Sequence, residues 1–171
     1  MPATFEDQLA IVHELLREVE RMERGERRRA GRRSRDAYER ELRLAGLAQR
    51  VAQAYTMIEG VLAYVARRID RAPVAGEDWH KQLISRCTGP WDDPKRPAVV
   101  STALAAELLE LCEFRHVVRN LYPTRLDERR VRENFERLVR AARTFAAETE
   151  VFAAGLSPAR RPRPERRPRA R

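Results

Sequence analysis

The sequence predicts an all-α protein, built as a four-helix bundle with one additional short helix and a basic C-terminal tail. Apolar residues recur at spacings of three and four along four long segments, which is the pattern of an amphipathic helix. The segments are rich in alanine, leucine, glutamate and arginine, which all favour helices. No segment shows the alternating pattern of a strand. A chain of 171 residues can bury a substantial core as one domain.

The first two helices are separated by a basic segment. An apolar stripe from Phe5 to Met22 predicts the first helix. The segment 24–35 is polar on all sides, and its two glycines favour a loop or a frayed helix end. A second helix is expected over residues 35–70, on a longer stripe of the same kind.

A short helix and a rigid loop are expected next. A proline and a glycine after residue 70 mark a turn, and Asp78 is placed to cap a short helix that carries Trp79 and His80. The segment 88–97 contains one glycine and three prolines. Because proline fixes φ and lacks an N–H group, this composition predicts a rigid loop.

Two further long helices complete the bundle. The third is expected to begin near Ala98 and to end at Tyr122, because the residue before a proline disfavours helical geometry. The last helix follows, with Asp127 as its N-cap and an apolar stripe that ends at Phe152.

Positive charge is concentrated at the C-terminal end. The net charge is +9, and residues 157–171 carry seven arginines and four prolines against one glutamate. This composition predicts a disordered tail after a helical domain of residues 1–156. The tail and the basic segment 24–35 are both suited to contact phosphates. The alternative is that both are solvated arms, in a chain that uses arginine almost everywhere in place of lysine.

Composition excludes several classes of protein. No apolar run is long enough to span a membrane, and the N-terminal residues contain acids rather than the apolar core of a secretory signal. We therefore expect a cytoplasmic protein that does not associate with a membrane. Cys87 and Cys112 lack a partner motif and are expected to be buried thiols rather than a disulfide. No histidine or cysteine pair has the spacing of zinc ligands, so neither a metal nor a cofactor is predicted.

The most informative segment is 114–122. In a helix, Arg115, Arg119 and Tyr122 lie on one stripe, and His116 and Asn120 lie on the adjacent stripe. Arginine binds phosphate through several planar donors, and histidine is the usual general acid or base near neutral pH. The stripe thus suits an anionic phosphodiester. The alternative is a solvated helix face or a set of interhelical ion pairs.

This segment resembles the signature of the HEPN superfamily, and within it the HepT-like toxin proteins. That signature is an arginine, four residues, a histidine, one residue and a tyrosine. Arg115 and Tyr122 match it, whereas Asn120 stands where the family has histidine. The segments 79–83 and 108–114 are also similar to HepT-like proteins.

The resemblance implies a four-helix-bundle homodimer in which the motifs of both protomers face one cleft. Characterised relatives are metal-independent endoribonucleases that act on RNA as toxins. Their antitoxin is a minimal nucleotidyltransferase, which in some systems adenylylates the motif tyrosine. By position that tyrosine is Tyr122.

On this reading Arg115 and Arg119 bind phosphate, His116 acts as acid or base, and Asn120 orients the substrate because an amide cannot transfer protons. His80 is ancillary, since a histidine beside a tryptophan at a helix start more often packs than catalyses. Two alternatives stay open. The first is an RNA-binding or protein-interaction module that has lost catalysis because of Asn120, and the second is a structural helical partner.

Overall fold

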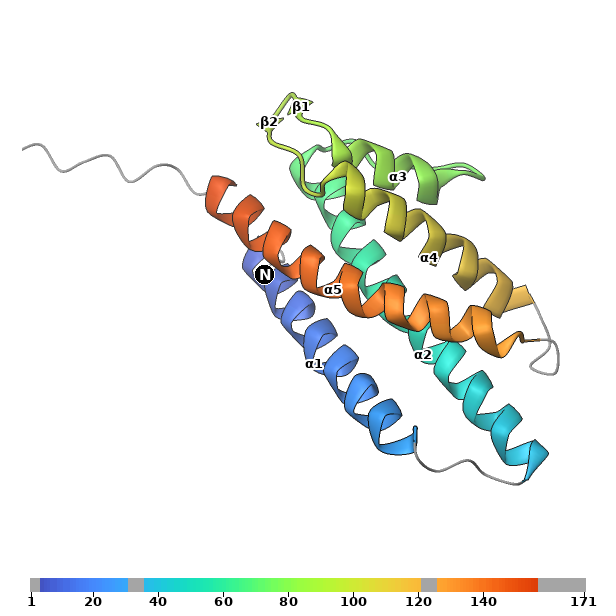
Figure 1. Cartoon of the computed structure of the whole chain (residues 1–171). Helices are drawn as coiled ribbons and strands as arrows, with labels where there is room; N and C mark the ends of the chain where they lie inside the picture. The colour runs from blue at the N-terminus through green and yellow to red at the C-terminus, as the bar shows by residue number, and fades with distance from the viewer. Residues whose placement is uncertain (1–3, 31–35, 121–125, 157–171) are drawn as a thin grey trace, which may run out of the picture.

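The computed structural model describes residues 4–30, 36–120 and 126–156, which form five α-helices, one π-helical turn and a small hairpin (Figure 1). The helices are α1 (Phe5–Arg29), α2 (Ala37–Tyr64), α3 (Trp79–Thr88), α4 (Thr102–Asn120) and α5 (Glu128–Leu156). The π-helix η1 (Val65–Ile69) continues α2, and strands β1 (Trp91–Asp92) and β2 (Lys95–Arg96) pair antiparallel. The predicted all-α fold is confirmed.

The four long helices form the bundle, and α3 packs on its outside. Helix α5 contacts α1, α2 and α4, while α3 lies against α4 and the C-terminal part of α2 (Figure 1). The apolar stripes of the four long helices meet in one core, where side chains such as Leu15, Ile58, Leu108 and Phe145 are at most 1% exposed. Burial of these stripes is the main stabilising contribution to the fold.

Helix α1 is longer than its sequence indicates. A capping box of Thr4 and Asp7 starts the helix, in which each residue's side chain accepts from the other's backbone N–H. The helix then continues through the glycine of the basic segment to Arg29, where a loop or frayed end was the expectation. Ion pairs offset the cost of the glycine, because Glu23 binds both Arg27, at 2.6 Å, and Arg143 of α5, at 2.7 Å.

The segment expected to be a rigid loop contains the hairpin of β1 and β2, so the prediction of no strand is wrong for these four residues. Helix α4 also begins later than expected, at Thr102. The backbone N–H groups of Val99 and Val100 instead donate to the carbonyl of Cys87, at 2.8 and 3.1 Å. Ser101 then accepts from the backbone of the first turn of α4 and acts as its cap.

A fully buried ion pair fixes the hairpin to the end of η1. The guanidinium of Arg96 binds both carboxylate oxygens of Asp70, with Nε–Oδ1 2.5 Å and Nη2–Oδ2 2.7 Å. Its Nη1 donates to the carbonyls of Gly89 and Pro97, at 3.1 and 2.9 Å. Neither charged side chain has any exposed surface. We call Asp70 and Arg96 the hairpin clip.

Several smaller expectations are confirmed. Asp127 accepts from the backbone N–H of Arg130 at 3.2 Å and so caps α5. Cys87 and Cys112 are buried free thiols. None of the described helices is long and apolar enough to cross a membrane. The predicted helix end at Tyr122 and the predicted disordered tail, residues 157–171, lie outside the described residues.

Candidate functional site

The last turns of α4 divide the motif residues between the interior and the surface. His116, Arg119 and Asn120 are exposed, but Arg115 is only 8% exposed and points into the protein. The reason is helical spacing, because Arg115 follows buried Leu108 by seven residues and therefore continues the apolar stripe of α4. The expected polar surface is thus formed by three of these four residues. Tyr122 lies outside the described residues.

The buried guanidinium meets a carboxylate from α2 and an imidazole from α3. Nη2 of Arg115 lies 3.5 Å from Oε2 of Glu59, and its Nη1 lies 3.4 Å from Nε2 of His80. Nδ1 of His80 forms a short hydrogen bond with Oε1 of Glu59. All three side chains are buried. We call Glu59, His80 and Arg115 the inner triad; it joins α2, α3 and α4.

The geometry of the inner triad assigns the tautomer of His80. A guanidinium can only donate hydrogen bonds, so the Nε2 atom that faces Arg115 acts as the acceptor. Nδ1 therefore carries the proton and donates it to Glu59. In this arrangement the carboxylate of Glu59 balances the guanidinium of Arg115, which is how buried charge is tolerated.

His80 connects the inner triad to the surface. Its ring stacks on the Trp79 indole, with centroids 3.7 Å apart, and meets the exposed ring of His116 edge to face, with centroids 5.2 Å apart. His80 is thus the packing histidine expected from the sequence. It also forms a direct contact between Glu59 and the motif histidine of α4, which the sequence did not indicate.

The environment of His116 favours its neutral form. Partial burial against its neighbours lowers the pKa of His116 below the ordinary 6.5, and the positive charges of Arg115 and Arg119 act in the same direction. The carboxylate of Glu59 opposes this shift. The neutral imidazole at the surface is therefore available to accept a proton near neutral pH.

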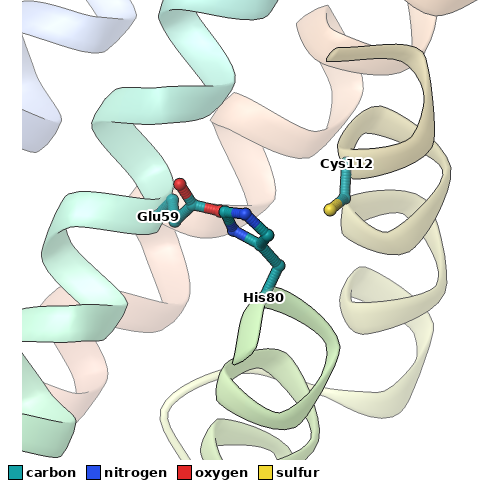
Figure 2. A group of neighbouring side chains, drawn as sticks. All are labelled: Glu59, His80 and Cys112. Carbon is teal, nitrogen blue, oxygen red and sulfur yellow. The ribbon is translucent and has the colours of Figure 1, made fainter. Parts of the chain in front are cut away.

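One group of described residues has the side chains of a metal site. Ligand atoms of Glu59, His80 and Cys112 all lie within 4.8 Å of one another, and Figure 2 shows the imidazole between the carboxylate and the thiol. Two features disfavour a cation there. Arg115 already places a positive charge against Glu59, and burial raises the pKa of the Cys112 thiol, which opposes the thiolate that a metal needs.

A polar atom without a partner lies beside this group. The hydroxyl of Tyr55, on α2, is buried and makes no hydrogen bond with the described residues. Burial raises the pKa of this phenol, and the neighbouring Cys112 and Glu59 add to the effect. The inner triad is therefore bordered by a neutral phenol and a neutral thiol rather than by further charges.

Sequence reasoning missed Glu59, although the sequence carries a signal for it. Glu59 is the only acidic residue between Glu41 and Asp70, in the most apolar stretch of α2, and it follows Tyr55 of the buried stripe by one helical turn. An isolated acid on a buried stripe needs a cationic partner. The candidate partners in the sequence are His80, Arg115 and His116.

Comparison with known proteins identifies the family of the chain. A family model for HepT-like proteins matches residues 46–156, which is more than half of the chain. No curated protein and no solved structure gives a significant match. The matched region includes the inner triad and all the motif residues that the structure describes. The chain therefore belongs to the HepT-like proteins of the HEPN superfamily.

Proposed function

We propose that this HepT-like protein is a metal-independent endoribonuclease that cleaves RNA at a cleft between two copies of the chain. The observation that carries the proposal is an exposed imidazole, His116, whose pKa is lowered and whose ring contacts the inner triad through His80. Exposed Arg119 lies one turn further along α4. A proton acceptor and a phosphate-binding cation thus share one helix end.

The reaction needs no co-substrate besides the RNA. His116 removes the proton of a ribose 2′-hydroxyl, and the oxygen attacks the adjacent phosphorus. The bond from phosphorus to the 5′-oxygen breaks, and that oxygen takes up a proton. The products are a 2′,3′-cyclic phosphate and a free 5′-hydroxyl. Arg119 stabilises the negative charge of the phosphorane, Asn120 orients the phosphate by hydrogen bonds, and Arg115 supports the site from below.

A homodimer supplies the second proton-transfer group. One imidazole can take the 2′ proton, but the leaving oxygen needs a protonated acid at the same moment. His116 of a second copy fills that role if the two α4 ends face each other. Light scattering of the purified chain should therefore give twice the monomer mass, and a strictly monomeric chain that cleaves RNA would contradict the composite cleft.

The central test is cleavage of a fluorescent single-stranded RNA by the purified full chain in EDTA. We expect His116→Ala to remove cleavage while leaving the circular dichroism spectrum unchanged. His13→Ala is the matched control, since His13 is also exposed but pairs with Glu150 on another face of the bundle. Undiminished cleavage by His116→Ala would overturn the assignment of this histidine.

We also propose that a minimal nucleotidyltransferase is the antitoxin and that Tyr122 is its target. The phenol would lose its proton and attack the α-phosphorus of ATP, with pyrophosphate as the leaving group. Co-expression with the neighbouring open reading frame, which we expect to encode that enzyme, should add one AMP to the intact mass. Tyr122→Phe should abolish the addition, and Tyr38→Phe, an exposed tyrosine on α2, should not.

A second candidate function is RNA binding without cleavage, and the observation that favours it is Asn120 at the position where the family has histidine. In that case the chain binds RNA in a salt-sensitive manner and releases no product. Asn120→His should then confer cleavage. Activity of the unaltered chain in EDTA would exclude this alternative.

A further inference from the structure

Helix α3 presents one side to the protein interior and one side to the surface. Its inward side carries His80, Leu83, Ile84 and Cys87, which are buried in the protein. On the outward side a groove of about 450 Å³ runs along α3 to Trp91 of the hairpin. The residues that line it are Lys81, Gln82, Ser85, Arg86 and Trp91.

The aromatic wall of this groove is held in a fixed orientation. The indole N–H of Trp91 donates to the carbonyl of Asp93 at 2.9 Å. The guanidinium of Arg86 lies over the ring, 4.8 Å from its centroid, and the same guanidinium donates to the carbonyl of Ala72. The ring of Trp91 is thus half-buried, anchored at its edge and covered on one face by Arg86, which also lines the groove, so a base would stack on the other face.

We propose that this groove binds a nucleotide of single-stranded RNA next to the cleaved bond. A fixed indole offers a stacking surface for any base. The ammonium of Lys81 suits a phosphate, and the amide of Gln82 and the hydroxyl of Ser85 suit base edges or a ribose 2′-hydroxyl. Together these groups supply a cation, two hydrogen-bonding side chains and an aromatic ring, which suit the phosphate, ribose and base of one nucleotide.

The position of the groove links it to the proposed cleavage site. Lys81 directly follows His80, whose ring contacts His116 at the surface. Under this proposal, one RNA strand contacts both sites, with one phosphate at His116 and another at Lys81. Asp92 and Asp93, the nearby acids of the hairpin, do not line the groove, and Asp92 lies opposite Lys95 in the strand register. The inference rests on the proposed function for the identity of its ligand.

Binding can be measured separately from cleavage in the His116→Ala background, using fluorescence anisotropy of a labelled hexauridylate. We expect Trp91→Ala to weaken binding about tenfold and Trp91→Phe to restore most of it, as for other stacking aromatics. Lys81→Ala should lower the slope of log affinity against log salt by roughly 0.7. Lys81 is fully on the surface, so this variant keeps the test valid if Trp91→Ala fails to fold.

The matched control is Lys95→Ala, which removes an exposed lysine of the hairpin outside the groove. Affinities of the Lys81 and Trp91 variants equal to that of the control would overturn the proposed groove even if the chain cleaves RNA. Conversely, selective loss of binding in a chain that never cleaves would sustain the groove and overturn the cleavage function. Equal displacement of the RNA by polyglutamate would assign the groove to an acidic protein instead.

Discussion

Two buried ion pairs lie near opposite ends of α3, and they are built differently. In the hairpin clip, Arg96 holds both oxygens of Asp70 and also donates to three backbone carbonyls, those of Gly89, Pro97 and Arg86, with no exposed surface on either side chain. In the inner triad, the guanidinium of Arg115 lies 3.4 to 3.5 Å from its partners. In the clip, the donors of Arg96 all have partners. In the triad, the contacts of Arg115 are longer, and His80 touches His116 at the surface.

The difference shows that burial of charge does not by itself identify a functional site. A guanidinium whose donors all have partners within the fold can bind nothing else, and it serves to fix the hairpin. The guanidinium of Arg115 is held by longer contacts, beside a phenol without a hydrogen-bond partner among the described residues and near an exposed imidazole, and under the proposed function it supports the phosphate site. Three substitutions within these groups, Arg96→Ala, Glu59→Gln and Asp70→Asn, separate the two kinds of ion pair.

The largest effect is expected from Arg96→Ala. It leaves the carboxylate of Asp70 buried without a partner, which costs about 3–5 kcal/mol of unfolding free energy. Urea denaturation followed by circular dichroism measures the loss. Lys95→Ala, one residue away and exposed, should change the value by less than about 0.5 kcal/mol. Similar stability of the two variants would show that the clip does not hold the hairpin.

Glu59→Gln should destabilise the fold less than Arg96→Ala does, but it should lower the activity more. The amide preserves the shape of the side chain and can still accept from His80, so we expect a loss of about 1–3 kcal/mol. Cleavage by the folded fraction should fall sharply, because His80 and Arg115 lose the charge that orients them. Asp70→Asn is the counterpart in the clip, and it should lower stability without lowering cleavage per folded molecule. Equal activity loss in both variants would remove the distinction.

The pH profile tests the connection between the triad and the surface. Because the pKa of His116 lies below 6.5, its neutral form is present at pH 7 and is lost as the pH falls through the lowered pKa. The acid limb of the cleavage rate should therefore lie below pH 6.5. Arg119→Gln removes one of the charges that lower this pKa and should move the limb to higher pH. A limb above 6.5 in the unaltered chain would contradict the assigned base.

The smallest effect is expected from the exposed pairs between helices. Arg143→Ala breaks a contact of 2.7 Å with Glu23, but the arginine side chain is 58% exposed. Solvent screens such a pair, so the unfolding free energy should change by no more than about 1 kcal/mol. A loss comparable to that of Arg96→Ala would mean that short distance, rather than burial, decides the strength of these pairs.

The sequence predicted the fold better than the site. Helical spacing located the buried stripes of all four long helices, because burial of apolar surface dominates their packing. The same spacing places Arg115 on the stripe of Leu108, but the charge of Arg115 predicts a surface position. Its burial is explained by the ion pair with Glu59. That pairing joins residues 56 positions apart, and only the docking of α2 against α4 brings them together. The groove beside Trp91 likewise depends on how the hairpin folds back on α3.

The unpartnered hydroxyl of Tyr55 has a practical consequence for these experiments. A buried hydroxyl that bonds to nothing costs about 1–3 kcal/mol of desolvation, and phenylalanine would fill the same space without that oxygen. Tyr55→Phe should therefore raise the melting temperature. In this more stable background, variants of Glu59 and Arg115 that lower stability should remain folded at the temperature of the assay. The Tyr55 hydroxyl thus lowers the stability of the fold, and selection for thermostability alone would be expected to remove it.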